Sequence, residues 1–352
     1  MRDMKKIAIY ALTPQGASLG QRIAYDLDGE LYLPSRLSDS HKGRPFDRLM
    51  DAVSGNFFSY HGHIFIAATG IVVRAIAPLL ESKDRDPAVV VLDQDGRYVI
   101  SLLSGHLGGA NEMAQMVARA IGGQAVITTA TDSAGLPSFD LMAKKRGMTI
   151  ANLGGVRHVN MALLTGDPVQ ILDPENRLGL QKGGAVEFSI QWRETESEWI
   201  NGCPGVWVTW RSTFPEQGEE CLVLYPRCLV AGMGCNRGTG AQEILELIKA
   251  TFKENDLALE SLSAVSTIEA KRDEDGLIEA ARTLGVPLHF FAPEEIESIE
   301  VPHPSGVVKK HMGVSSVCEA TALLKTEGGR LLVPKTKSRN VTLAVALENY
   351  PL

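Results

Sequence analysis

The strongest constraint on the fold is an alternation along the chain between short apolar runs rich in β-branched residues and longer stretches with helical periodicity. In the first 150 residues the expected strands are 6–12, 63–68, 88–92, 98–103 and 124–128, and the expected helices are 16–27, 71–80 and 108–121. Alternating strands and helices favour an α/β fold with a mostly parallel sheet. The Asp95-Gly96 turn between two apolar runs predicts one antiparallel hairpin within it.

This pattern divides the chain into three regions. The α/β alternation of residues 1–149 stops at 150–226, which hold all four tryptophans together with short strand patterns and turn signals. It returns over 227–352. We therefore expect two α/β domains with mostly parallel sheets, joined by a small strand-rich middle region. Large aromatic side chains in so small a region are expected to be packing anchors.

Composition excludes several classes of function. Lys and Arg number 35 and Asp and Glu number 42, so the formal net charge of −7 argues against a general nucleic-acid binder. The five cysteines contain no C-x-x-C pair, and His61 and His63 have no third ligand at a recognisable spacing, so no metal site is expected. The sequence has neither a signal peptide nor an apolar stretch long enough to span a bilayer. We expect a cytoplasmic protein.

The densest cluster of chemically useful residues is Ser104-Gly-His-Leu-Gly-Gly-Ala-Asn111, between an expected strand and an expected helix. Ligands of open α/β sheets bind at the carboxyl ends of strands, and glycines let a backbone approach a ligand closely. His106 is a candidate general acid or base, and Ser104 and Asn111 are candidate partners of a carbonyl or carboxylate. The alternative is a tight connection with a solvated histidine.

Two further segments are placed at the ends of expected strands. In Gly70-Ile-Val-Val-Arg74, a guanidinium near a helix N-terminus is unfavourable unless it meets an anion, which supports a carboxylate or phosphate contact. Thr128-Thr-Ala-Thr-Asp132 offers hydroxyls and a carboxylate, and Asp132 can orient His106 if the two strand ends are neighbours. The alternatives are a surface arginine and a helix N-cap.

Glycines and charged residues recur in the C-terminal region. Gly232-Met-Gly-Cys-Asn-Arg-Gly238 fails the dinucleotide spacing by one residue and lacks the Gly-Lys-Ser/Thr of a P-loop. We therefore expect an anion-binding turn with Arg237 there, and no nucleotide. Cys235, near an expected helix start, is either a stabilised thiolate or a packed small residue. The polar segment 266–274 and the basic run 335–339 are either solvated or contacts for an acidic ligand.

Taken together and in order, these segments resemble the CbiG family of cobalamin biosynthesis along nearly the whole chain. The segments that carry the resemblance are Gly70–Arg74, Leu103–Asn111, Thr129–Asp132, Gly232–Gly238, Ser266–Lys271, Gly313–Ala320, Lys335–Lys337 and Asn340–Thr342. Each segment alone is weak evidence for this family, whereas the complete set in this order is specific to it. The middle region, 150–226, contributes no motif.

The resemblance implies a cobalt-precorrin-5A hydrolase, which opens the ring A lactone of a ring-contracted cobalt macrocycle, releases acetaldehyde and yields cobalt-precorrin-5B. Cobalt belongs to this substrate, so no separate cofactor is expected. His106, Ser104 and Asp132 are the catalytic candidates. The residues expected to contact the substrate and its carboxylate arms are Gly70, Arg74, Gly105, Gly108, Gly109, Asn111, Thr131, Gly234, Arg237, Gly238, Lys271, Ser316, Glu319 and Lys337.

Two other functions stay open at this point. A non-catalytic tetrapyrrole-binding or carrier protein of the same pathway would use the same anion-binding turns. A nucleotide-binding regulatory protein is disfavoured by the glycine spacing. The expected partners are the cobalt-tetrapyrrole and other enzymes of the corrin pathway, with no nucleic acid or membrane, and the chain is expected to form at most a dimer.

Overall fold

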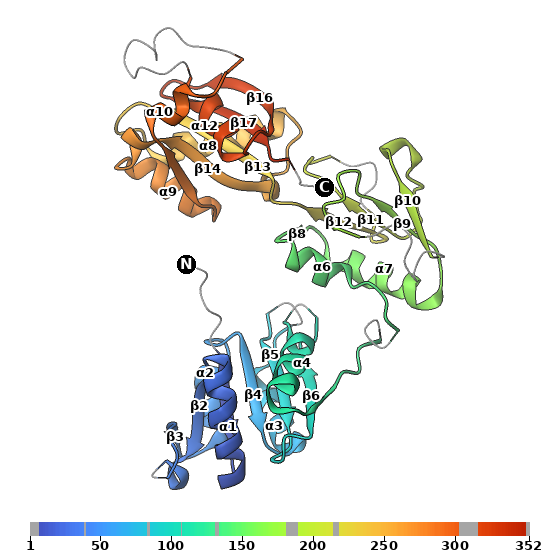
Figure 1. Ribbon diagram of the computed structural model, residues 1–352. Coiled ribbons are helices and arrows are strands. Elements are labelled where there is room, and N and C mark those ends of the chain that lie inside the picture. The colour runs from blue at the N-terminus through green and yellow to red at the C-terminus, as the bar shows by residue number, and fades with distance from the viewer. Residues whose placement is uncertain are drawn as a thin grey trace. The chain divides into compact units, whose positions relative to one another are not determined.

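The computed structural model describes residues 7–38, 40–82, 85–106, 108–130, 134–180, 189–213, 218–302 and 316–349. The chain forms two compact units, unit 1 over residues 1–141 and unit 2 over residues 142–352 (Figure 1). Both units combine mostly parallel sheets with packed helices, which confirms the predicted α/β class.

Unit 1 contains one seven-stranded sheet in the order β3-β2-β1-β4-β5-β6-β7. Its strands are β1 (Ile7–Ala11), β2 (Glu30–Pro34), β3 (Arg44–Phe46), β4 (Gly62–Ile66), β5 (Ala88–Leu92), β6 (Tyr98–Leu103) and β7 (Gln124–Val126). Its helices are α1 (Pro14–Leu27), α2 (Leu49–Asn56), α3 (Thr69–Ile76) and α4 (Ala110–Ile121), and α6 (Phe139–Lys145) begins at its end. Strands β1 to β5 run parallel to one another.

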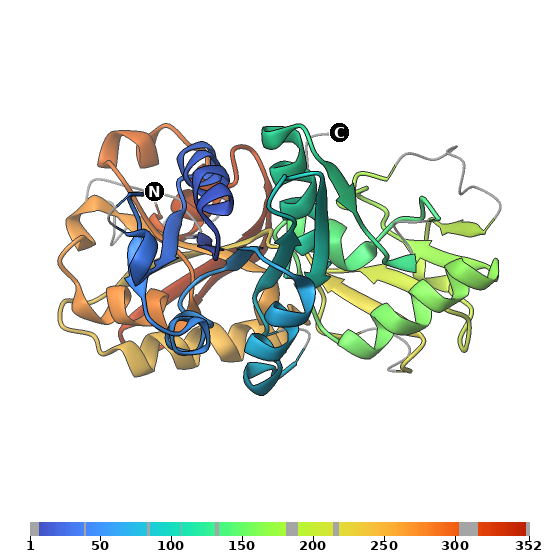
Figure 2. The ribbon, with the colours of Figure 1, turned by 90° about the horizontal axis from the view of Figure 1, so that it is seen from below.

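Both faces of this sheet are buried, as its continuous apolar strands require. Successive residues of β1 point to opposite faces, so Ile9 joins the core under α1 and α4, while Tyr10 joins the core under α2 and α3 (Figures 1 and 2). Helix α1 begins after Thr13, whose Oγ1 accepts the backbone N–H of Gly16 at 3.1 Å. This capping bond fixes the start of α1 at the carboxyl end of β1.

The last two strands of the sheet run in the opposite direction. β6 pairs antiparallel with β5, with Val99 opposite Leu92, so the predicted hairpin is confirmed, and β7 is parallel to β6. The segment after β6 therefore lies at the edge of the sheet where β4 and β5 begin. The turn after β4 lies at the other edge, roughly 16 Å away along the five-residue β5.

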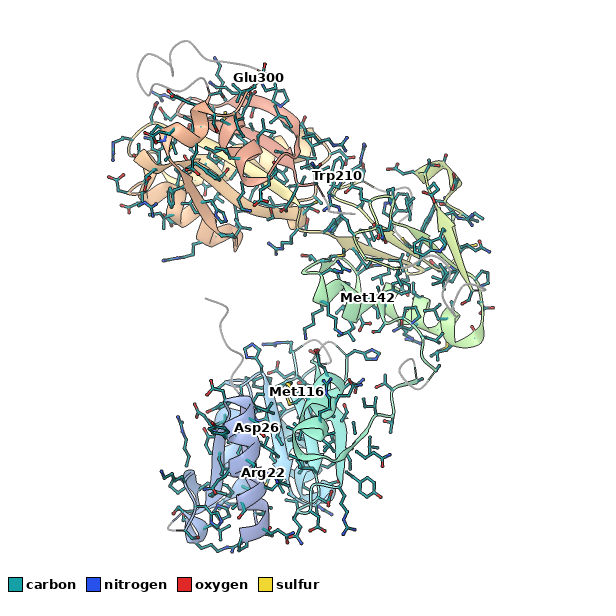
Figure 3. The ribbon with its side chains drawn as sticks, in the orientation of Figure 1. Arg22, Asp26, Met116, Met142, Trp210 and Glu300 are labelled. Atoms are coloured by element: carbon teal, nitrogen blue, oxygen red, sulfur yellow. The ribbon has the colours of Figure 1, made fainter. Side chains whose placement is uncertain are left out.

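Helical spacing in 108–121 predicts that Met113, Met116, Val117 and Ala120 point inward, and helix α4 departs from this prediction at Met116. Met113 and Val117 are buried as expected, but Met116 is exposed (Figure 3). The alanines Ala114 and Ala118 lie against the sheet instead. Small residues on the inward stripe let the helix pack close to the strands, and that stripe lies one residue further along than the sequence pattern indicated.

The first part of unit 2 is itself α/β rather than only strand-rich. Its sheet has the order β10-β9-β11-β12-β8, with β8 alone antiparallel to its neighbour. The elements are β8 (Thr149–Ile150), α7 (Leu153–Thr165), β9 (Val169–Leu172), β10 (Ile190–Arg193), β11 (Gly205–Val208) and β12 (Cys221–Tyr225). The sequence does not predict α7, because Gly154-Gly155 is a turn signal. A β-carbon at Gly155 would lie 2.7 Å from Cα of Leu222, so the glycine lets α7 rest directly on β12.

Trp207 is buried edge-on against Trp199 at 4.8 Å, which confirms these tryptophans as packing anchors.

The second part of unit 2 is a five-stranded sheet in the order β15-β14-β13-β17-β16. Its elements are β13 (Leu229–Cys235), α8 (Ala241–Glu254), β14 (Leu262–Ile268), α9 (Asp275–Leu284), β15 (Leu288–Phe291), α10 (Pro293–Glu297), α12 (Val317–Lys325), β16 (Arg330–Lys337) and β17 (Val341–Leu347). The sequence places 232–235 in a loop and 266–268 in a turn, but both extend strands, because paired neighbours on each side satisfy their backbones. The carboxyl ends of β13, β14 and β15 meet at one edge.

Candidate functional site

The segment between β6 and α4 forms a tight turn that depends on its glycines. Ser104 has a left-handed backbone with φ of 57°, and its carbonyl accepts the N–H of Ala110 at 3.1 Å. A β-carbon at Gly108 would collide with the side chain and carbonyl of Ser104, and one at Gly105 would lie 2.7 Å from Oδ1 of Asn111. Gly109 has a φ of 92°, which favours glycine. Local sterics therefore fix this turn, and the sequence motif identifies it correctly.

The side chain of Asn111 links the turn to neighbouring segments through hydrogen bonds. Its side chain is 5% exposed; Oδ1 accepts from Oγ of Ser101 at 2.6 Å, and Nδ2 donates to Oγ1 of Thr129 at 3.0 Å. These bonds join β6, α4 and the segment after β7. The expected proximity of the two strand ends is therefore present, and the buried amide positions the turn.

His106 lies on this turn beside a buried carboxylate. Its Nδ1 is 3.6 Å from Oδ2 of Asp140, and its side chain is 15% exposed. Asp140 is 3% exposed and accepts from Oγ of Ser138 at 2.6 Å. Burial acts to raise the pKa of Asp140, but the hydrogen bonds from His106 and Ser138 outweigh burial and hold the pKa below its usual range. The carboxylate is thus ionised at neutral pH and stabilises a proton on His106.

Asp140 is a carboxylate partner that sequence reasoning missed. It lies 34 positions after His106, and no spacing or motif links the two residues. The expected orienting carboxylate, Asp132, and the expected contact Thr131 lie outside the described residues. Oγ of Ser104 is buried and has no hydrogen-bond partner among the described residues.

Gly70 and Arg74 lie at the opposite edge of the sheet from His106, on the turn and helix that follow β4. The dipole reasoning for Arg74 is wrong, because α3 begins at Thr69 and places this arginine in the last turn, where a cation is favourable. Its Nη1 donates to the carbonyl of Gly70 at 3.0 Å, within the same helix.

The C-terminal candidates gather at one sheet edge, but carboxylates accompany the cations. Arg237 Nη1 contacts Oδ2 of Asp273 at 2.9 Å, and Lys271 Nζ is 3.4 Å from Oε1 of Glu274. The backbone N–H of Gly238 donates to Oε2 of Glu274 at 3.0 Å. Lys271 and Glu274 are both buried. This edge is therefore a mixed-charge cluster, in which carboxylates pair with the cations of the expected anion-binding turn.

Buried polar residues of α12 support the same sheet. Ser316 occupies the N-cap position and Glu319 is fully buried, with Oε1 accepting the N–H of Lys335 at 2.9 Å. Lys337 is exposed at the end of β16, on the strand paired with β17, whose Thr342 is opposite Gly234.

Cys235 does not lie at a helix start. It ends β13, and α8 begins six residues later at Ala241. Burial raises the pKa of its thiol, so the thiolate alternative is wrong and the packed thiol is correct.

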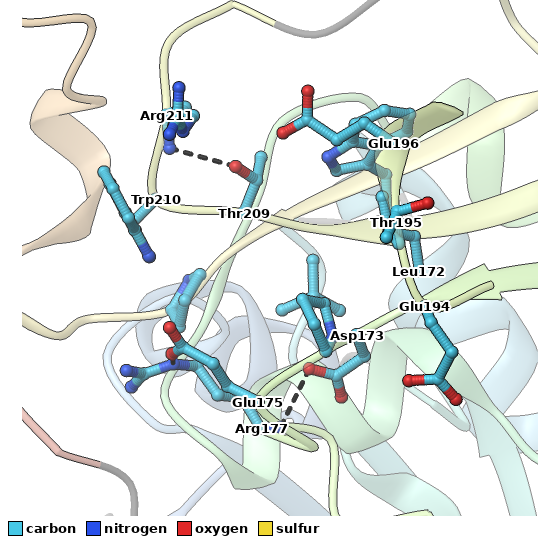
Figure 4. Close-up of a pocket in the computed structure, with 14 residues that line it drawn as sticks. Leu172, Asp173, Glu175, Arg177, Glu194, Thr195, Glu196, Thr209, Trp210 and Arg211 are labelled. Atoms are coloured by element: carbon cyan, nitrogen blue, oxygen red, sulfur yellow. Dashed lines mark hydrogen bonds and ion pairs between the residues drawn. The ribbon is translucent and has the colours of Figure 1, made fainter. Parts of the chain in front are cut away.

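A cavity of about 230 Å³ lies at the carboxyl ends of β9 and β11 in unit 2 (Figure 4). Its wall includes Asp173, which accepts the N–H groups of Arg177 and Leu178 at 2.9 and 2.8 Å, together with Trp210 and Arg211. Burial raises the pKa of Asp173 above its usual range. No sequence motif marked this cavity.

Within the described residues, no group of three His, Cys, Asp or Glu side chains is arranged to hold a metal ion. Among the same residues, no helix has the length and apolar character needed to cross a membrane.

Comparison with known proteins finds similarity along nearly the whole chain. The family models for the cobalamin synthesis G N-terminal region, the cobalamin biosynthesis central region and the cobalamin synthesis G C-terminus match residues 51–132, 137–226 and 229–346. A cobalt-precorrin-5A hydrolase of Priestia megaterium is 35% identical, over 97% of this chain and 95% of its own. One of Salmonella typhimurium is 32% identical, over 97% and 98%. A probable cobalt-precorrin-5A hydrolase of Methanocaldococcus jannaschii is 27% identical, over 82% and 86%.

Proposed function

Since this chain belongs to the cobalamin synthesis G family and is a hydrolase of cobalamin biosynthesis, we propose that it converts cobalt-precorrin-5A into cobalt-precorrin-5B. In this reaction the ring A lactone of the ring-contracted macrocycle opens and a two-carbon fragment leaves as acetaldehyde. The full-length similarity to relatives of that name supports the substrate. The observation that carries the chemistry is the contact of His106 with the buried carboxylate of Asp140 on a strand-end turn.

The reaction needs one group that both accepts and returns a proton. Water adds to the lactone carbonyl, the ring C–O bond breaks, and the alcohol oxygen takes up a proton. That alcohol then loses its proton as the carbonyl of acetaldehyde forms, the C–C bond breaks and the electron pair stays with the macrocycle. A histidine side chain can accept a proton in one step and return it in the next, so His106 serves both steps. Asp140 contacts Nδ1 and orients the ring for this proton exchange.

The turn supplies the groups that stabilise the developing negative charge. Oγ of Ser104 is the buried polar atom with no partner among the described residues, and it donates to the lactone oxygen as charge builds there. Gly105 and Gly108 let the turn close tightly on itself, because a side chain at either position would strike Asn111 or Ser104. Asn111 acts by holding the turn in place through Ser101 and Thr129.

The substrate bears several carboxylate arms and carries its own cobalt, so no step uses a metal held by the protein. Within unit 2, Lys337 and the cluster of Arg237 and Lys271 are cations suited to binding carboxylates. Asp273 and Glu274 already neutralise part of this charge. The cluster therefore accepts an arm by exchanging one carboxylate partner for another.

The assay is acetaldehyde release from purified cobalt-precorrin-5A under anaerobic conditions. We expect His106→Ala to lose about 10²- to 10⁴-fold in kcat, the range of general acid–base catalysis, while still binding the macrocycle. His158→Ala is the matched control, because His158 is a half-buried histidine on α7, outside the turn that holds His106. Wild-type turnover by His106→Ala would remove His106 from the reaction. Stoichiometric binding without product by the wild-type chain would favour the carrier function instead.

A further inference from the structure

Unit 1 contains a cleft at the sheet edge opposite His106. The sheet order places β1 beside β4, while the chain leaves β1 towards β2 and leaves β4 towards β5. Such a reversal opens a crevice at the carboxyl ends of the two strands, and open α/β sheets bind ligands there. A cleft of about 490 Å³ lies at this point, lined by residues that follow β1, β4 and β5.

The walls of this cleft are mostly apolar and partly open to solvent. Its apolar lining includes Leu12, Ile66 and Val91. Ile71 on α3 and Tyr98 at the start of β6 border it and remain 44% and 53% exposed. Exposed large apolar side chains around a hollow indicate a surface that a ligand covers, and an aromatic ring at the mouth suits a flat apolar body.

Positive electrostatic features converge at one end of the cleft. Helices α1 and α3 both begin there, and neither has an acidic residue in its first turn. Arg36, just after β2, donates from Nη2 to the carbonyl of Leu12 at 2.8 Å, which fixes its guanidinium beside the cleft wall. The nearby carboxylate of Asp93 is turned into the hairpin, where it accepts the N–H of Tyr98 at 2.8 Å.

We propose that this cleft binds a small molecule that combines a flat apolar body with one anionic group, a carboxylate or a phosphate. The apolar body lies between Ile71 and Tyr98, and the anionic group lies towards Arg36 and the start of α1. The site is separate from the turn that holds His106 and goes beyond the reaction proposed above.

The test is fluorescence titration of the full-length chain with 8-anilinonaphthalene-1-sulfonate, a flat aromatic anion. We expect one saturable site, and about tenfold or greater loss of affinity in Ile71→Glu, which places a negative charge in the apolar wall. An acidic residue in the first turn of α3 favours the helix, so this variant is expected to fold. Val73→Glu is the matched control, since Val73 is 45% exposed on the same helix but does not line the cleft, and its affinity should stay within about twofold of wild type.

Arg36→Glu tests the anionic end separately. We expect about tenfold weaker binding of the sulfonate dye and little change for N-phenyl-1-naphthylamine, an uncharged dye of similar shape. Equal affinities of Ile71→Glu and Val73→Glu, or equal effects of Arg36→Glu on both dyes, would overturn the proposal. Displacement of the bound sulfonate by the carboxylated macrocycle would identify an edge of the substrate as the occupant, and displacement by AMP would identify a separate phosphate-bearing ligand.

Discussion

The most quantitative prediction concerns His63, which is fully buried on β4. Its Nε2 donates to the carbonyl of Phe57 at 2.9 Å, and Nδ1 has no hydrogen-bond partner among the described residues. Its ring stacks on Phe57 at 5.3 Å and on Tyr10 at 6.0 Å. This environment holds a neutral imidazole and has no place for a second ring proton.

Burial lowers the pKa of His63 from the ordinary 6.5 to about 4, against a smaller opposing effect of the Phe57 carbonyl. The unfolded chain therefore binds a proton between pH 6.5 and about 4 that the folded chain does not. Protonation of His63 therefore does not reduce the unfolding free energy of unit 1 above pH 6.5. Below pH 6.5 this free energy falls as the pH drops towards 4. That difference in pKa corresponds to about 3 kcal/mol of unfolding free energy.

The assay compares wild type with His63→Phe, which keeps the aromatic stack and removes the titrating group. All four tryptophans lie in unit 2, so tryptophan fluorescence does not report on unit 1. Hydrogen exchange of backbone amides in β1 and β4, measured between pH 7 and pH 4 with correction for intrinsic exchange, gives the opening free energy directly. Amides of β13 and β17 serve as an internal control.

We expect the opening free energy of β1 and β4 to fall by about 3 kcal/mol more in wild type than in His63→Phe, while β13 and β17 change equally in both proteins. The reasoning is refuted if the two proteins lose the same stability over this pH range. It is also refuted if the difference appears equally in β13 and β17, because a local buried histidine cannot act on a separate unit.

Three further predictions follow from single contacts. Asp140→Asn should lower kcat for acetaldehyde release about 10²-fold or more with little change in KM, because the amide cannot stabilise a protonated His106; an unchanged kcat, or an equal loss in Ser138→Ala, would contradict a positioning role. Gly108→Ala should lower turnover at least about tenfold because its β-carbon collides with Ser104, whereas Gly154→Ala, which has open space around it, should match wild type in the same assay. Tyr60→Phe should destabilise unit 1 by about 1–3 kcal/mol in hydrogen exchange, since its hydroxyl bonds Glu30 at 2.6 Å and Tyr32 at 2.8 Å; an effect below about 0.5 kcal/mol would show these bonds to be worth little.

Local sequence patterns predicted the bounds of helices and strands well where one type of residue dominates a short stretch of the chain. The expected bounds 88–92 and 98–103 match β5 and β6. The patterns failed where tertiary contacts outweigh local preference. Helix α7 begins at a glycine pair because β12 lies against it, and β14 includes the polar Ser266-Thr267 because it is paired on both sides.

Some features of the candidate site could likewise be predicted from local sequence, and others depend on tertiary contacts. The turn at Ser104–Asn111 was predicted because its glycines and polar residues are consecutive, and sterics within a few residues decide its shape. The pairing of His106 with Asp140 was not predicted, because the two residues are brought together only by the folded chain. Gly70 and His106 were each placed at a strand end, but the pattern could not say at which edge of the sheet.

The sequence by itself determined the α/β class, the hairpin at Asp95-Gly96, the glycine-dependent turn and the family, because each depends on neighbouring residues or on their order. Only the tertiary structure decided the strand order, the reversed direction of β6 and β7, and the carboxylate beside His106. An apolar strand buried on both faces fits between many neighbours and in either direction, and only packing of the complete sheet and its helices selects one arrangement.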